Sequence, residues 1–141
     1  MYVVAATNRP DIIDPAMIRP GRLDYQLFVS LPTTAERAEI LKTLTKKTPL
    51  TSDVDLALIA RDSRARNFSG ADLSRLIREA TLFSLRKVFS AREGQSEKSL
   101  AQNVVVSMAD FEEAFGSIKP SVSDQDRERY ESLRSFFDIA Q

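Results

Sequence analysis

Two short segments carry polar groups suited to binding a ligand. The first holds Asn8, whose carboxamide offers a hydrogen-bond donor and an acceptor together, and Arg19 and Arg22, whose guanidinium groups flank the tight-turn dipeptide Pro20–Gly21. The second is Gly70–Ala71, at the start of a predicted long helix. A helix start presents free amides and partial positive charge, and these two small residues leave room for a ligand to approach the backbone.

Each of these features also has a plain structural explanation. Asn-Arg-Pro commonly starts a turn, and surface arginines are usually only solvated. Ser69 and Asp72 have the spacing of a capping box, so the second segment is also compatible with an ordinary capped helix. We expect Asp11, Asp14 and Asp24 to brace the loops around them rather than to do acid–base work. Residue types alone leave both interpretations open.

The composition excludes several classes of site. The 141 residues include no Cys and no His, so the chain supplies no disulfide, no Cys/His zinc site, no thiol nucleophile and no Ser-His-Asp triad. Twenty basic residues balance twenty acidic ones, and no bulk charge attracts nucleic acid or anionic lipid. The longest apolar run, Tyr2–Ala6, is far short of the roughly 20 residues of a membrane span. We expect an intracellular protein with no metal, nucleic-acid or membrane site.

The residues around the first segment have the sequence pattern of strands and loops. Four of the six prolines lie within residues 1–32. Tyr2–Ala6 is a continuous apolar run, typical of a strand buried on both faces of a parallel sheet, and Leu27–Val29 predicts a second strand. Asn8 then follows a strand at the edge where open α/β sheets bind ligands. Two such strands are not stable alone, so we expect this segment to be cut from a larger domain.

After Pro32 the apolar spacing becomes helical. Thr33 or Thr34 predicts a helix running to about Lys47, and Asp53 or Asp55 predicts a short one through Ala60. A Ser-x-x-Asp pattern then opens each of three further helices. These patterns lie at residues 69–72, 107–110 and 123–126, with a polar mobile loop at 94–102, a short extended segment at 103–106 and a helix end at Pro120.

The stretch from Val3 to Asp24, VVAATNRPDIIDPAMIRPGRLD, resembles the second half of the ATPase module in the AAA family of P-loop ATPases. The Asn-Arg-Pro, Asp-Pro and Arg-Pro-Gly-Arg elements carry the resemblance. It implies a mainly α chain with two domains. Residues 1–32 would be the C-terminal edge of a P-loop α/β ATPase core, with one or two strands. Residues 33–141 would be the helical lid bundle with its C-terminal helix.

The resemblance also implies roles for the singled-out residues. Asn8 corresponds to sensor 1, which holds a γ-phosphate oxygen and orients the attacking water. Arg19 and Arg22 correspond to arginine fingers, which reach into the active site of a neighbouring subunit. Gly70 and Ala71 correspond to the sensor-2 region that closes over ATP bound with Mg2+. Leu44 stands where some family members carry a histidine near the base and ribose, so we expect that contact to be absent.

The motifs that bind the triphosphate are missing from this sequence. No GxxxxGK[ST] occurs, and no apolar run is followed by paired acids that would bind magnesium and activate water. The family places both elements upstream of the sensor-1 strand. We therefore expect the chain to act only as part of a larger ATPase and not to hydrolyse ATP alone.

The tail points to one branch of the family. Residues 118–127, IKPSVSDQDR, with Tyr130-Glu131-Ser132-Leu133, resemble the end of the second ATPase module in the nuclear valosin-containing-protein-like branch. That implies a homohexameric ring that releases assembly factors from maturing large ribosomal subunits, in the nucleus and nucleolus. The alternatives are a ubiquitin-linked segregase or proteasomal unfoldase, with a cytoplasmic location, and a non-enzymatic helical module that binds proteins.

Overall fold

The computed structural model describes residues 2–90 and 104–137, with side chains through residue 134. The chain divides into two compact units. The helical unit is Leu31–Glu128, and the loop unit comprises the described residues on either side of it, 2–30 and 129–137. The predicted mainly helical fold is confirmed, because α-helices account for most of the described structure after Leu31.

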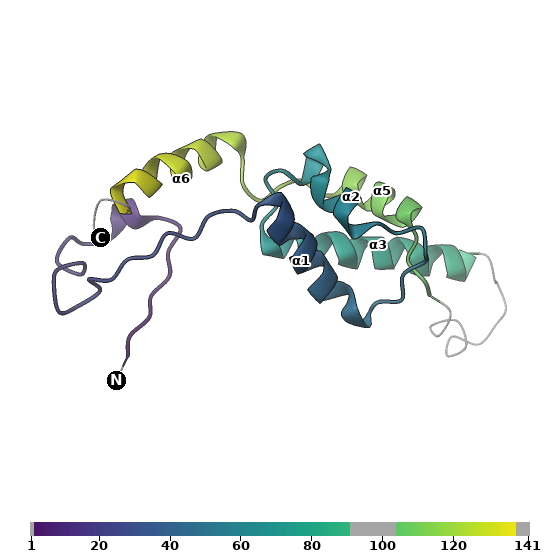
Figure 1. The fold of residues 1–141 in the computed structure, drawn as a ribbon, viewed down its shortest axis with the longest axis horizontal. Coiled ribbons are helices and arrows are strands. Elements are labelled where there is room, and N and C mark those ends of the chain that lie inside the picture. The colour runs from purple at the N-terminus through teal and green to yellow at the C-terminus, as the bar shows by residue number, and fades with distance from the viewer. Residues whose placement is uncertain (1, 91–103, 138–141) are drawn as a thin grey trace. The chain divides into compact units, whose positions relative to one another are not determined.

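The helical unit is built around one long helix, α3 (Gly70–Ser90), which contacts α5 (Met108–Ser117) and α1 (Thr34–Leu44), as Figure 1 shows. Helix α1 continues into a 3-10 turn, Thr45–Lys47, and packs against the short α2 (Leu56–Arg61). A second 3-10 turn, Ser63–Ala65, leads toward α3. The last helix, α6 (Asp124–Phe137), begins in this unit.

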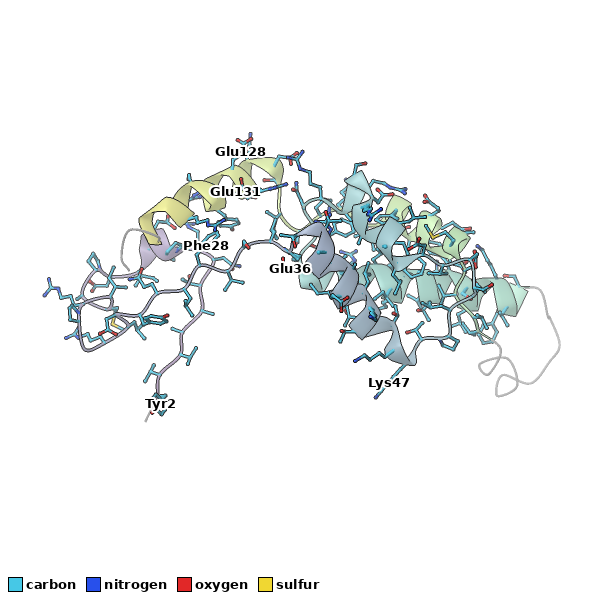
Figure 2. All side chains as sticks on the ribbon, in the orientation of Figure 1. Tyr2, Phe28, Glu36, Lys47, Glu128 and Glu131 are labelled. Atoms are coloured by element: carbon cyan, nitrogen blue, oxygen red, sulfur yellow. The ribbon has the colours of Figure 1, made fainter. Side chains whose placement is uncertain are left out.

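Side chains placed as predicted start the helices. Thr33 and Glu36 form a reciprocal capping box at the start of α1. Glu36 is labelled in Figure 2. The Asp55 side chain accepts hydrogen bonds from two backbone amides at the start of α2. The Ser-x-x-Asp pairs at 69–72, 107–110 and 123–126 all form hydrogen bonds at the starts of α3, α5 and α6. Each bonded pair satisfies amides that a helix start otherwise leaves without partners, which is why these boundaries were readable from the sequence.

The core of the helical unit lies between α1, α2, α3, α5 and the segment before α3. Phe68 and Phe115 stack with ring centroids 6.0 Å apart, and Phe111 is completely buried. Such aromatic burial contributes more than small aliphatic side chains do, because stabilisation scales with the apolar area removed from water. The other fully buried large side chains are Leu41, Ile59, Leu73, Leu76 and Val106.

One backbone pairing joins distant parts of the helical unit. Leu50 and Val106 form an isolated parallel bridge, in which the Val106 amide donates to Pro49 at 2.9 Å and the Thr51 amide donates to Val106 at 3.0 Å. This agrees with the predicted extended segment near Val106. The predicted loop at 94–102 lies outside the described residues.

In the loop unit, the regular structure described is a 3-10 turn, Pro10–Ile12, and the end of α6. The two predicted strands are not confirmed, because Tyr2–Ala6 and Leu27–Val29 form no strand among the described residues. The side chains of Tyr2 and Val4 are 100% and 94% exposed, and Figure 2 shows Tyr2 projecting from its segment. A β-strand needs a neighbouring strand to pair with its backbone hydrogen-bonding groups. The apolar sequence pattern predicts a strand that is buried by such neighbours, and it does not form without them.

Candidate functional site

The loop from Asp14 to Asp24 is held by its own backbone and side chains. The Met17 amide donates to the backbone carbonyl of Asp14 at 2.8 Å, and the Leu23 amide donates to the Met17 carbonyl at 3.0 Å. A guanidinium nitrogen of Arg22 donates to the carbonyl of Ala16 at 3.0 Å. Arg22 therefore fastens the two sides of the loop together.

The turn between the two arginines depends on Gly21. Its φ of 85° lies in the left-handed region that side chains with a Cβ disfavour. The Gly21 amide donates to a carboxylate oxygen of Asp24 at 3.0 Å. This backbone hydrogen bond lowers the pKa of Asp24. Asp24 thus braces the turn, as the sequence predicted for it.

Arg19 contrasts with Arg22 on the same loop. The side chain of Arg19 is exposed and forms no hydrogen bond or ion pair within the described residues. Its backbone carbonyl accepts a hydrogen bond from the Arg22 amide at 3.2 Å. The backbone of Arg19 is fixed, and its guanidinium is available. That arrangement suits contact with a charge supplied from outside the loop.

Asn8 lies at an exposed bend beside a second braced corner. The Arg9 amide donates to the Thr7 hydroxyl at 3.0 Å, and the Arg9 guanidinium pairs with Asp11 at 2.8 Å. That hydrogen bond and charge lower the pKa of Asp11 to about 2. Asp11 therefore braces the corner, while the carboxamide of Asn8 forms no hydrogen bond within the described part of the chain.

Gly70 and Ala71 are the exposed first residues of α3. Their amides precede the intrahelical hydrogen-bond ladder, so they remain available as donors. A Cβ built on Gly70 would meet no atom within 4 Å, so the space in front of this backbone is open. The geometry is that of an accessible helix start, compatible with the predicted approach of a nucleotide.

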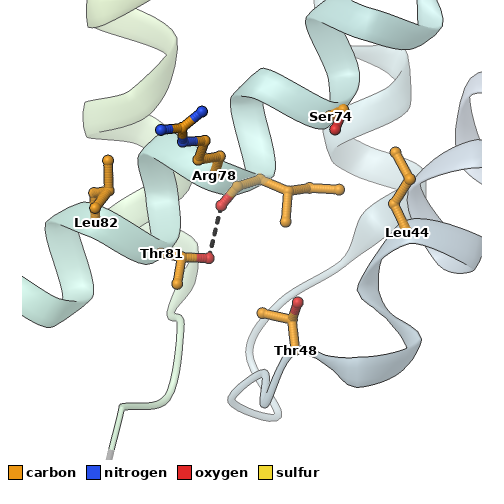
Figure 3. A pocket seen from close by; sticks show the side chains of 7 residues that line it. Leu44, Thr48, Ser74, Arg78, Thr81 and Leu82 are labelled. Atoms are coloured by element: carbon orange, nitrogen blue, oxygen red, sulfur yellow. Dashed lines mark hydrogen bonds between the residues drawn. The ribbon is translucent and has the colours of Figure 1, made fainter. Parts of the chain in front are cut away.

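A groove of about 330 Å³ lies between α3 and the end of α1, shown in Figure 3. Ser74, Arg78 and Thr81 recur at the three- and four-residue spacing that starts from Gly70. Leu44 forms the opposite wall of the groove. The position at which some family members carry a histidine, and this chain carries Leu44, therefore lies at this groove. The remaining lining residues are Thr48, Ile77 and Leu82. We did not predict the groove, although the spacing along α3 was the signal that could have revealed it.

The two predicted groups of site residues fall in different units. Asn8, Arg19 and Arg22 belong to the loop unit, and Gly70 and Ala71 belong to the helical unit. Among residues 2–90 and 104–137, no cluster of acidic side chains is arranged to hold a metal ion. No helix in the same ranges is long and apolar enough to cross a membrane.

Comparison with known proteins identifies the family. Residues 53–113 match the AAA+ lid domain. Over 94% of its length the chain is 56% identical to an uncharacterized AAA domain-containing protein of Schizosaccharomyces pombe. The chain belongs to the AAA ATPase family. It is also 49% identical over 94% of its length to the ribosome biogenesis ATPase RIX7 of Saccharomyces cerevisiae, and 50% identical over 95% to the nuclear valosin-containing protein-like protein of Mus musculus.

This AAA chain spans less than a fifth of the relatives that it matches, 18%, 18% and 16% of their respective lengths. The match to the AAA+ lid domain covers Gly70 and Ala71, and Asn8, Arg19 and Arg22 lie outside it. The predicted membership of the AAA family is confirmed. The names of two of these relatives agree with the branch that the tail residues indicate.

Proposed function

We propose that this chain is the C-terminal part of a hexameric AAA ATPase, comprising the end of the α/β core at residues 1–32 and the helical lid at 33–141. The observation that carries the proposal is the contrast between Arg19 and Arg22. One guanidinium is tied to the Ala16 carbonyl and fixes the loop, and the other is exposed without a partner among the described residues. A rigid loop that presents one available cation suits a finger directed at a neighbouring subunit.

In this proposal each residue acts by binding or orientation. Arg19 stabilises negative charge that develops on the transferred phosphoryl group in the adjacent subunit, and Arg22 keeps Arg19 in place. Asn8 uses its donor and acceptor to hold a γ-phosphate oxygen and to orient the attacking water. Gly70 and Ala71 close over the nucleotide with backbone amides.

ATP with Mg2+ is the nucleotide implied for the full-length protein. The open helix start at Gly70 fits a nucleotide, because a side chain is absent where the ligand would approach. Mg2+ would supply charge neutralisation of the phosphates. The described residues contain no acidic cluster arranged to hold that ion.

The cellular role follows the similarity to ribosome biogenesis ATPases. We infer that the ring remodels protein complexes and releases assembly factors from pre-ribosomal large subunits, in the nucleus and nucleolus. The support is the identity of 49% to RIX7 and 50% to the nuclear valosin-containing protein-like protein over nearly the whole chain.

A mixing assay tests the ring mechanism. Full-length subunits with Arg19→Ala and Arg22→Ala are combined with subunits that keep both arginines but lack the P-loop lysine of this module, and the P-loop lysine of any other ATPase module is replaced in all subunits. Neither partner alone should hydrolyse ATP, and mixed rings should regain activity because intact arginines then face intact P-loops. An Arg75→Ala subunit, changed at an exposed arginine of α3, is the matched control and should be active alone. Mixed rings that stay inactive would contradict the assignment.

A further inference from the structure

One carboxylate joins two segments that are 49 residues apart. The Oδ2 atom of Asp72 accepts the Ser69 amide at 2.9 Å and the Ser69 hydroxyl at 2.8 Å. The same atom accepts the Ser121 hydroxyl at 2.6 Å and the Ser121 amide at 3.3 Å. A capping box needs only the bonds with Ser69. The bonds with Ser121 are therefore an additional tie between the start of α3 and the segment before α6.

A second pair of contacts runs beside the first. The side-chain amide of Asn67 donates to Asp124 at 2.7 Å, and its oxygen accepts from Arg127 at 3.2 Å. Asn67 is buried, whereas Asp124 is exposed and Arg127 half-buried, so these bonds are partly shielded from water. We call this set of contacts the α3–α6 clamp. Its members are Asn67, Ser69, Asp72, Ser121, Asp124 and Arg127.

Comparison within the chain shows that the clamp does more than cap a helix. The Ser123–Asp126 pair at the start of α6 forms a hydroxyl-to-carboxylate bond of 2.6 Å and an amide-to-hydroxyl bond of 3.1 Å, at an exposed site. Asp72, by contrast, is only 5% exposed. Burial disfavours its charge, but the hydrogen bonds from Ser121 and Ser69 outweigh burial and lower the pKa of Asp72. The clamp therefore stabilises the charged form of a carboxylate that is largely removed from water.

The two exposed amides of the candidate nucleotide site lie between clamp residues. Gly70 and Ala71 occupy the positions between Ser69 and Asp72, and both of those neighbours are fixed by the bonds described above. The hydroxyls of Ser69 and Ser121 are also within 3.3 Å of each other. A displacement of Ser121 therefore changes the hydrogen bonding on both sides of Gly70–Ala71.

We propose that Ser121 is a positioning residue for the amides of Gly70 and Ala71, and that it couples nucleotide binding to the order of the first turn of α6. The proposal rests on the proposed function, because it requires a nucleotide at Gly70–Ala71. The coupling is reciprocal: if the α6 start strengthens nucleotide binding, the bound nucleotide stabilises the α6 start by the same factor. The start of the C-terminal helix would then respond to the occupancy of the lid.

The test compares two serines of one loop in the full-length ring, with the P-loop lysine of any other ATPase module replaced. Ser121→Ala removes the hydroxyl that reaches Asp72 and leaves the capping box with Ser69 intact. Ser123→Ala removes a hydroxyl that bonds only near its own helix start, and is the matched control. ADP is the probe, and its dissociation constant is measured by calorimetry.

We expect Ser121→Ala to weaken ADP binding at least about fivefold, the lower end of usual coupling between sites. Ser123→Ala should stay within about twofold, since it leaves α3 untouched. Ser121→Thr keeps a hydroxyl and should restore affinity. In the parent protein ADP should slow amide hydrogen exchange in residues 122–128, and Ser121→Ala should remove that protection. A role confined to stability would not make exchange in α6 depend on ADP.

A Gly70→Val variant separates failure of this proposal from failure of the proposed function. If Gly70→Val weakens ADP binding and Ser121→Ala leaves both affinity and exchange unchanged, the nucleotide site stands and the positioning role of Ser121 is overturned. If Gly70→Val also leaves affinity unchanged in a folded ring, the nucleotide does not contact the lid there, and both proposals fall.

Discussion

The guanidinium of Arg37 donates two hydrogen bonds to the carbonyl oxygen of Ala60, at 3.0 and 2.8 Å. It also donates to the Pro32 carbonyl and to the Thr34 hydroxyl, each at 3.0 Å. Arg37 is buried, so a single cation ties the start of α1 and the entry to the helical unit onto the end of α2. A positive charge at a helix end also interacts favourably with the helix dipole.

Replacing this fork should destabilise the helical unit. Arg37→Met keeps apolar bulk but leaves the carbonyls of Ala60 and Pro32 without their donor, at a cost of about 1–3 kcal/mol for a buried unsatisfied group. Arg37→Lys keeps the charge and loses the planar fork, so we expect an intermediate loss. Urea unfolding followed by circular dichroism measures both. Unchanged unfolding of Arg37→Met would mean that water replaces the guanidinium without penalty.

The core should depend most on its aromatic residues. Phe111 is 0% exposed, and Phe111→Ala should lower the free energy of unfolding by about 3–5 kcal/mol, because it removes buried area and leaves a cavity. Leu58 in α2 is 56% exposed and provides the control. Leu58→Ala should change stability by no more than about 0.5 kcal/mol. Thermal unfolding of the two variants should therefore differ clearly.

Acid should weaken the helical unit through its buried carboxylates. Asp110 accepts from Lys87 at 2.8 Å and from the Ser107 amide at 2.9 Å. Burial opposes the charge of Asp110, but these bonds prevail and lower its pKa. A carboxyl whose folded-state pKa is depressed stabilises the fold fully above its unfolded pKa of about 3.9, and this contribution is lost as pH falls through the folded value.

Stability should accordingly fall on acidification below about pH 4, and Asp110→Asn should reduce this dependence. The measurement is the urea midpoint at pH 6 and at pH 3. Asp126→Asn, at an exposed cap, is the comparison and should retain most of the pH dependence. An Asp110→Asn protein with the parent's full dependence would place the titrating group elsewhere.

The two loop arginines should differ kinetically in the assembled ring. Arg19→Ala should reduce kcat by a factor on the order of 1000 with nearly unchanged nucleotide affinity, since a finger acts on charge that develops in the transition state. Arg22→Ala should reduce kcat less, because it loosens the loop at Ala16 and leaves the Arg19 guanidinium present. Steady-state turnover and ADP binding measure the two effects. Parent-like turnover of Arg19→Ala would remove it from the active site.

The sequence predicted best those features that depend on local chemistry. Thr33, one of the two residues predicted to cap α1, does so, and the pairs Ser69–Asp72 and Ser107–Asp110 formed as expected, because each bond lies within one helical turn. Helix starts and the exposed Gly70–Ala71 amides could thus be placed from spacing alone. Asp11 and Asp24 likewise brace their own turns, two or three residues away.

Features that depend on distant contacts could not be read in this way. Ser121 looks like an ordinary loop serine, and only the fold brings it to Asp72. The different roles of Arg19 and Arg22 also required the position of the Ala16 carbonyl. The strand prediction for Tyr2–Ala6 shows the reverse case, since an apolar run indicates a buried strand only when another strand is beside it.

The exposed apolar segments have a consequence for handling the protein. Tyr2, Val4, Leu27 and Val29 are highly exposed and belong to no strand among the described residues. Unprotected β-prone segments of this kind readily pair with copies of themselves. A concentrated solution of this chain alone is therefore prone to aggregate through its first thirty residues, and a preparation limited to Leu31–Glu128 should stay dispersed at higher concentration.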